Sequence, residues 1–98
     1  MIEITNNNLE KEIKEGKVLV DFNATWCGPC RMLKPILEEY SKEATIKICG
    51  VDVDQNEELA RNYNIYSIPC LILFENGKEV KRNVGLVSLD EIKNIVGE

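Results

Sequence analysis

The chain has 98 residues, enough for one hydrophobic core, so we expect a single domain over residues 1–98. Twelve basic residues stand against seventeen acidic ones, and this net charge of −5 argues against nucleic acid or an anionic membrane as a partner. There is no histidine, which excludes imidazole as a catalytic base or metal ligand. No stretch approaches the roughly 18 apolar residues of a membrane span.

The N-terminal segment predicts a short edge strand followed by a helix. Ile2 and Ile4 alternate with polar residues, which is typical of a strand. Residues 6–8 are three asparagines that could cap a helix, and Leu9 and Ile13 then lie one helical turn apart. No basic stretch followed by an apolar one precedes them, so we expect a cytoplasmic protein, in which thiols are kept reduced.

A pair of cysteines follows the first strongly apolar segment. Residues 17–22 are rich in β-branched side chains and predict a buried central strand. Apolar residues at helical spacing then predict a helix from about Cys27 or Cys30 to Ser41, kinked at Pro35. The unpaired N–H groups and the dipole at the start of a helix stabilise a thiolate and lower its pKa. Two cysteines at this spacing in a strand–helix context indicate a redox-active pair.

The remaining sequence predicts three more strands, the last two joined in a hairpin, and two helices. Residues 46–53 form an apolar strand, and residues 54–56 offer an N-cap for a short helix. Residues 71–74 lead into Asn76-Gly77, a strong hairpin signal because a type I′ turn needs positive φ at both positions. Residues 88–91 form a capping box for the last helix. The order βαβαβαββα predicts an α/β fold, with a mixed sheet and helices on both faces.

Asp21 is a candidate for proton transfer. It lies among the apolar residues of the predicted central strand, and burial penalises a carboxylate, so we expect its pKa to rise. A carboxyl group with a pKa near neutrality can exchange a proton with a nearby thiol, and Cys30 is the candidate. The alternative is an aspartate that faces water at the end of the strand.

The four cysteines leave a metal-binding interpretation open. Cys27 and Cys30 could form half of a zinc site that Cys49 and Cys70 complete. Structural zinc sites usually combine two closely spaced ligand pairs, whereas the second pair here is far apart in strand-like sequence. We therefore favour redox chemistry and expect no metal. Cys49 and Cys70 are most simply small buried apolar residues, although a redox or regulatory role for Cys70 also stays open.

Several sequence blocks match a known family in order. The most characteristic is Trp26-Cys27-Gly28-Pro29-Cys30, and the others are Val20-Asp21-Phe22, Ala24, Pro35, Asp52–Asn56, Ile68-Pro69, Phe74–Lys78 and Val84-Gly85. Over nearly its whole length the chain resembles the thioredoxin family. The resemblance implies the thioredoxin fold and a thiol–disulfide oxidoreductase that reduces disulfides of client proteins. It also implies re-reduction by a reductase, and no cofactor beyond a redox-active disulfide between Cys27 and Cys30.

The resemblance also assigns roles around the cysteine pair. Cys27, nearer the exposed turn, is expected to attack the substrate disulfide, and Cys30 to resolve the mixed disulfide. Gly28 and Pro29 form the turn between the two sulfurs and, with Trp26, tune the redox pair. Trp26 is expected to pack beside the disulfide and shield it, or to belong to the core.

Three further residues are implied in substrate binding. Pro69 is expected to follow a cis peptide bond. Ile68 and Pro69 would offer a backbone edge to an extended substrate segment, in the manner of strand addition. Gly85 and Ile68 would border the apolar patch around Cys27, because glycine allows close backbone approach.

The chain departs from the family pattern at three positions. Asn23 stands where a second tryptophan is common, Gly50 where a lysine accompanies the aspartate, and Cys70 where threonine often follows the cis-proline. Without that lysine, we expect proton transfer at Asp21 to be tuned differently. An oxidant or isomerase of the same fold, and a non-enzymatic metal or scaffold module, are the alternatives to a monomeric reductant.

Overall fold

The computed structural model describes residues 1–98 and contains five strands and four helices in the predicted order βαβαβαββα. The strands form one sheet in the order β1-β3-β2-β4-β5, so β2 is central and β1 lies at an edge. β2 pairs in parallel with β3 and antiparallel with β4, which confirms the mixed sheet. In chain order the elements are β1 (Ile2–Glu3), α1 (Glu10–Ile13), β2 (Lys17–Asn23), α2 (Gly28–Glu43), β3 (Lys47–Asp52), α3 (Glu57–Asn62), β4 (Cys70–Glu75), β5 (Lys78–Val84) and α4 (Leu89–Val96).

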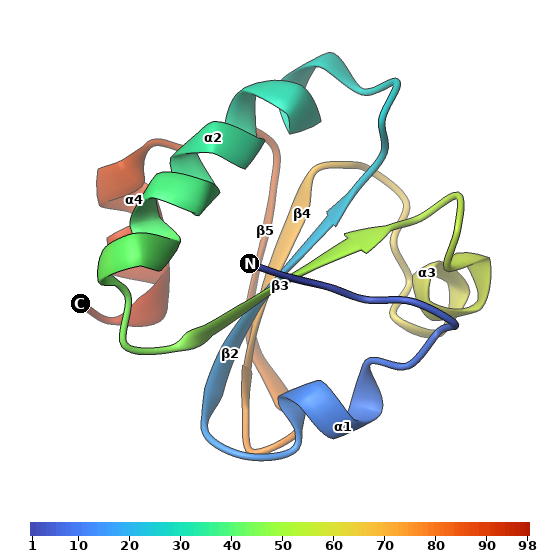
Figure 1. Cartoon of the computed structure of the whole chain (residues 1–98), viewed down its shortest axis with the longest axis horizontal. Coiled ribbons are helices and arrows are strands. Elements are labelled where there is room, and N and C mark those ends of the chain that lie inside the picture. The colour runs from blue at the N-terminus through green and yellow to red at the C-terminus, as the bar shows by residue number, and fades with distance from the viewer.

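Helices cover both faces of the sheet, with α2 and α4 on one face and α1 and α3 on the other (Figure 1). The side chains of β2 alternate between these faces, because successive residues of a strand point to opposite sides. Val18, Val20 and Phe22 pack in the core cluster on the α1 and α3 face. Leu19 packs in the cluster on the α2 and α4 face. Asp21 shares the face of Leu19 and therefore lies on the side of α2, the helix that follows the cysteine pair.

The local signals at the end of the chain are confirmed. Asn76 and Gly77 have φ angles of 51° and 85°, as a type I′ hairpin turn between β4 and β5 requires. Ser88 caps α4 and forms the predicted capping box with Glu91. Gly97 ends α4 in the left-handed conformation.

The prediction that residues 6–8 cap α1 is wrong. The N-cap of α1 is Leu9, without a side-chain hydrogen bond. The Oδ1 of Asn7 instead accepts the backbone N–H of Leu59 in the first turn of α3, at 3.3 Å. In return, the Oδ1 of Asn56 at the N-cap of α3 accepts the backbone N–H of Asn7, at 3.0 Å. The two amides join the segment after β1 to the start of α3. The side chains that were expected to cap helices locally therefore form tertiary hydrogen bonds.

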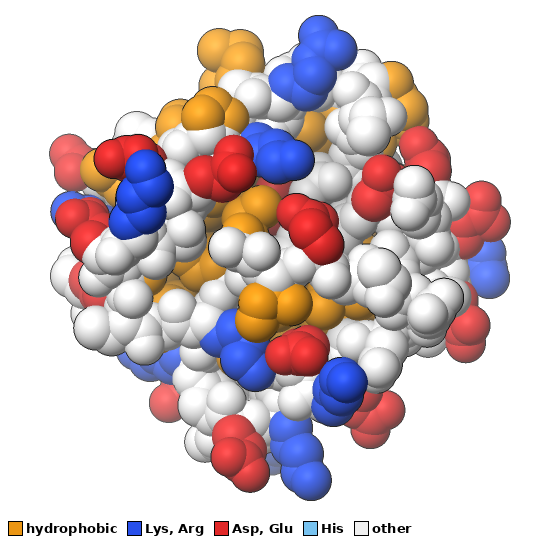
Figure 2. Space-filling model, viewed as in Figure 1, with side chains coloured by type: hydrophobic (Ala, Val, Ile, Leu, Met, Phe, Trp, Pro, Cys, Tyr) orange, Lys and Arg blue, Asp and Glu red, His pale blue; other side chains and the backbone are white.

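The surface mixes charged and apolar side chains. On the face seen in Figure 2, acidic and basic side chains are interspersed, and apolar side chains come to the surface at the upper edge, near the start of α2. None of the four helices combines the length and the apolar content that crossing a membrane requires.

Candidate active site

Cys27 and Cys30 lie at the start of α2, beyond the C-terminal end of the central strand β2 (Figure 1). They form a disulfide with their Cα atoms 5.2 Å apart. Cys27 is the N-cap of α2, and its Sγ accepts the backbone N–H of Cys30 at 3.2 Å. Gly28 and Pro29 are the first two helical residues, so the link between the sulfurs is a helical turn and not a loop before the helix. Proline fits this position because the first N–H groups of a helix have no internal partner.

The two sulfurs differ in their surroundings more than in their exposure. Cys27 is 6% exposed and Cys30 is 3% exposed, so the expected greater exposure of Cys27 is slight in the disulfide form. The Sγ of Cys27 lies 3.9 Å from the carbonyl oxygen of Ile68, in the loop before β4. Cys30 instead lines a cleft of about 340 Å³ together with Asn23 and Lys34. The pair therefore has one side toward the loop that carries Pro69 and another toward this cleft.

Asp21 is fully buried, so the alternative of a water-facing aspartate is wrong. Burial raises the pKa of its carboxyl from 3.8 to about 6, while the hydrogen bond from Asn23 opposes that rise. The Nδ2 of Asn23 donates to Oδ2 of Asp21 at 3.2 Å. Oδ1 has no hydrogen-bond partner and remains able to accept a proton. The carboxyl group thus has the protonation range expected of a group that exchanges a proton with a thiol.

Asn23, which stands where a tryptophan is common in the family, has a contact of its own in the site. It lies two residues after Asp21 on the same strand, and its side chain holds one oxygen of the buried carboxyl group. Residues i and i+2 of a strand share a face, so this contact could have been inferred from the sequence. The sequence reasoning also missed Lys34 of α2, whose positive charge lowers the pKa of Asp21, and Glu3 of β1, whose negative charge raises it.

Trp26 is not a core residue, so the core-packing alternative is wrong. Its side chain is 67% exposed, and its Nε1 donates to the Oδ2 of Asp54 at 2.8 Å. The short connection between β2 and α2 carries it outside both large core clusters. Together with Tyr66 and Ile68 it lines a mostly apolar groove of about 320 Å³ beside α3. Asp54 and the almost fully exposed Tyr66 belong to this side of the site and were not predicted.

The loop before β4 has the expected cis peptide bond between Ile68 and Pro69. The carbonyl oxygen of Pro69 accepts the N–H of Gly85 at 2.8 Å. Gly85 has a φ of +106°, and a Cβ at this position would meet nothing within 4 Å. Within the molecule, the backbone conformation therefore favours glycine here, and close packing does not.

Arg82 of β5 fixes the segment that leads into this loop. Its guanidinium group donates to the carbonyl oxygens of Tyr63 and Asn64, at 2.8 and 3.2 Å. Glu79 binds the same guanidinium group through both carboxylate oxygens, each at 2.8 Å. The arginine thus ties the end of α3 to the edge strand. Nothing local in the sequence indicates this, because the partners lie 18 and 19 residues away.

Cys49 and Cys70 are free and buried in the cluster on the α1 and α3 face. Burial raises the pKa of Cys49 to about 11 and also raises that of Cys70. Cys27 and Cys30 belong to a different cluster. No three potential ligands among the Cys, Asp and Glu side chains gather closely enough to hold a metal ion. The four cysteines are therefore not arranged as the zinc site considered from the sequence.

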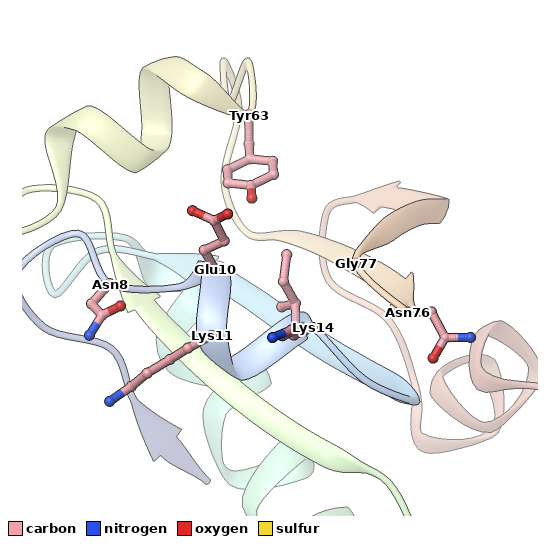
Figure 3. Close-up of a pocket in the computed structure, with 8 residues that line it drawn as sticks. Asn8, Glu10, Lys11, Lys14, Tyr63, Asn76 and Gly77 are labelled. Carbon is pink, nitrogen blue, oxygen red and sulfur yellow. The ribbon is translucent and has the colours of Figure 1, made fainter.

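A third hollow, of about 630 Å³, lies between α1, the end of α3 and the hairpin tip (Figure 3). Glu10 and Tyr63 point toward one another across it. The hairpin tip lies beside the first residue of β2, because Lys17 pairs with Glu75. This hollow therefore lies at the N-terminal end of β2, whereas Cys27 lies beyond its C-terminal end.

A disulfide at the N-terminus of a helix, packed against a cis-proline loop on a mixed sheet, defines the class of thiol–disulfide oxidoreductases. A family model described as Thioredoxin matches residues 1–98. A thioredoxin from Chlamydia trachomatis is 43% identical over 96 residues, which cover 97% of this chain and 94% of that protein. A thioredoxin from Bacillus subtilis is 38% identical over 100 residues, which cover 100% of this chain and 96% of that protein.

The comparison with solved structures agrees. A mutant thioredoxin from Halobacterium salinarum superposes with a TM-score of 0.89 at 34% identity, covering 97% of this chain and 86% of that one. The chain belongs to the thioredoxin family. It has the thioredoxin fold and is a thiol–disulfide oxidoreductase with a redox-active disulfide. Proteins of this family take electrons from a reductase and pass them to disulfide-containing clients.

Proposed function

We propose that this thioredoxin reduces protein disulfides in the cytoplasm as a monomer, with Cys27 as the nucleophile and Cys30 as the resolving thiol. The observation that carries this assignment is the position of Cys27. It is the N-cap of α2, and its Sγ accepts the N–H of Cys30. In the reduced protein the same N–H group and the helix dipole stabilise a thiolate on Cys27, and a thiolate is the attacking species in disulfide exchange.

The reaction proceeds in two exchanges. The Cys27 thiolate attacks one sulfur of the client disulfide, so that a mixed disulfide forms and the other client sulfur leaves as a thiolate. Cys30 then loses its proton to Asp21 and attacks the Sγ of Cys27. The Cys27–Cys30 disulfide forms, and the second client sulfur leaves. The client gains two electrons, and a reductase later returns two electrons and two protons to the cysteine pair.

The client is proposed to bind along the loop of Ile68 and Pro69. The carbonyl oxygen of Ile68 lies 3.9 Å from the Sγ of Cys27, so a chain lying against this loop would bring its disulfide to the nucleophile. Extended segments bind such edges through main-chain hydrogen bonds, while side-chain pockets supply specificity. Here the groove beside Trp26 and Tyr66 would take an apolar client side chain. Gly85 would border the same patch, because its N–H binds the carbonyl oxygen of Pro69.

An insulin-type disulfide reduction assay tests this function. We expect turnover with a dithiol electron donor, no effect of a metal chelator, and no turnover by Cys27→Ser. Loss of activity with chelator would support the metal or scaffold alternative. The midpoint potential of the Cys27–Cys30 couple separates a reductant from an oxidant or isomerase, since a reductant should lie near the thioredoxin value of about −270 mV. Sedimentation analysis and cell fractionation test the monomer and the cytoplasmic location.

A further inference from the structure

A row of three residues crosses the sheet on the face that α2 covers. Glu3 of β1 pairs with Gly50 of β3, and Gly50 pairs with Asp21 of β2. Paired residues on neighbouring strands point to the same face of a sheet. The side chains of Glu3 and Asp21 therefore share a face, and the residue between them is a glycine.

The carboxylate of Glu3 lies over Gly50. A Cβ at position 50 would be 3.1 Å from Oε2 of Glu3 and 3.3 Å from Oε1. The acidic group thus takes the space that a side chain at position 50 would fill. Because Gly50 pairs with Asp21 on its other side, the Glu3 carboxylate lies over the residue that adjoins Asp21.

Few other charges face the Asp21 carboxyl group. Lys34 of α2 is the one cation that acts on it, and its influence is weaker than that of Glu3. On β4 the residue opposite Asp21 is the uncharged Leu71. Cys30 of α2 titrates when the disulfide is reduced, and it lines the same cleft as Asn23, the hydrogen-bond partner of Asp21. Glu3, on the edge strand β1, is therefore the acidic group whose charge acts on the Asp21 carboxyl.

We propose that Glu3 is a positioning residue for the resolving step: its carboxylate, laid over Gly50, opposes negative charge on Asp21 and makes Asp21 a stronger base toward the Cys30 thiol. The inference rests on the proposed role of Asp21 in that step. The proton of Cys30 passes to the unpartnered Oδ1 of Asp21, and the sulfur then attacks Cys27 as described above. Burial contributes most to the raised pKa of Asp21, and Glu3 adds to it, while Asn23 and Lys34 act in the opposite direction.

Titration of Asp21 by carboxyl ¹³C NMR tests the coupling without any activity assay. Glu3→Gln removes one negative charge, so we expect the titration midpoint of Asp21 to fall by about half a pH unit or more. Glu3→Asp should restore part of the difference. Glu15→Gln is the matched control, because Glu15 is exposed and precedes β2, at the opposite end of that strand from Asp21, and the net charge changes equally. An unchanged midpoint in Glu3→Gln, or an equal fall in Glu15→Gln, would overturn the proposal.

The pH dependence of the resolving rate tests the consequence. A mixed disulfide with Cys27 is prepared, and its conversion to the Cys27–Cys30 disulfide is followed from pH 5 to 9. The acid limb of the profile should move to lower pH in Glu3→Gln and return in Glu3→Asp. If the NMR midpoint stays where it is in Glu3→Gln, the Glu3 proposal fails while the role of Asp21 stands. If the NMR midpoint moves and the rate profile does not, Asp21 has no part in the step and both ideas fail.

Discussion

The two sides of the disulfide differ in what surrounds the sulfurs, and the proposed mechanism gives them different tasks. On the Cys27 side lie the cis-proline loop and a mostly apolar groove lined by the exposed side chains of Trp26 and Tyr66. On the Cys30 side lie Asn23 and Lys34, and the side chain of Asn23 donates to the buried carboxyl of Asp21. Recognition needs exposed apolar surface, whereas proton transfer needs a shielded group with a shifted pKa. Cys27 and Cys30 are almost equally buried, so any difference in their roles must come from the groups that surround each sulfur.

After the complete loss of turnover expected for Cys27→Ser, the largest effect should come from removing the resolving thiol. Cys30→Ser leaves the proposed nucleophile in place, so attack on a client should proceed and the complex should stall as a mixed disulfide. We expect multiple-turnover activity to fall on the order of 10³-fold. Mass spectrometry of the trapped adduct checks the assignment. An adduct on any cysteine other than Cys27 would contradict the division of roles.

The next effect is on stability, and it concerns the Cys30 side alone. The pKa of Asp21 is raised from 3.8 to about 6 in the folded protein, so the folded state binds the proton more tightly than the unfolded state. The native protein should therefore lose stability as the pH rises from about 4 through 6. A difference of about two pKa units corresponds to roughly 3 kcal/mol.

Asp21→Asn should cancel this loss. We expect the unfolding free energy of the oxidised variant to exceed that of the native chain at pH 8, by up to about 3 kcal/mol, and the gain to disappear below pH 4. Urea denaturation at pH 4, 6 and 8 measures it. Parallel pH curves for the two proteins would show that Asp21 is not the titrating group. The same variant should slow the resolving step, which separates its catalytic effect from its stabilising one.

Substitutions on the Cys27 side should weaken the binding of a client protein and leave the free energy of unfolding nearly unchanged. Trp26→Ala and Tyr66→Ala remove exposed apolar surface, so the free energy of unfolding should change by less than about 0.5 kcal/mol. We expect KM for a protein client to rise several-fold, while the rate with a small aromatic disulfide stays near that of the native chain. An equal loss with both substrates would mean that the groove acts on the chemistry itself.

A smaller effect on the Cys27 side should follow from removing the hydrogen bonds of Arg82 to the segment before the cis-proline loop. Arg82→Met removes the hydrogen bonds to the carbonyl oxygens of Tyr63 and Asn64, and we expect a cost of about 1 kcal/mol in unfolding free energy. Amide hydrogen exchange should become faster over residues 63–68. Lys81→Met is the matched control, since it removes one positive charge from the same strand. Equal exchange rates in the two variants would show that Arg82 does not hold the loop.

The smallest effect should come from the cysteines that belong to neither side. Cys49 and Cys70 are buried, and burial raises the pKa of both thiols, so neither should react in the native oxidised protein at pH 8. Cys70→Ala should leave the midpoint potential and the turnover unchanged. Titration with an aromatic disulfide reagent should find no accessible thiols before unfolding and two after it. Rapid reaction of Cys70 in the folded state would instead support a third redox thiol.

Local patterns in the sequence determined most of the fold. The alternation of β2, the Asn76-Gly77 turn and the Ser88 capping box are each read within a few residues, because strand pleat, turn geometry and helix capping are local properties. The position of Cys27 and Cys30 and the burial of Asp21 follow from the same periodicities. Family membership then implied the cis bond before Pro69, which the structure contains.

Only the tertiary structure decided which polar side chains meet. The Oδ1 of Asn56 accepts the N–H of Asn7 and the Oδ1 of Asn7 accepts the N–H of Leu59, so neither amide side chain caps its own helix. Trp26 lies exposed against Asp54 instead of in the core. Glu3 comes near Asp21 only because β1 and β2 flank β3 in one register, with glycine at position 50. Such contacts depend on strand order and loop paths, which set distances between residues far apart in the chain, and no local periodicity encodes them.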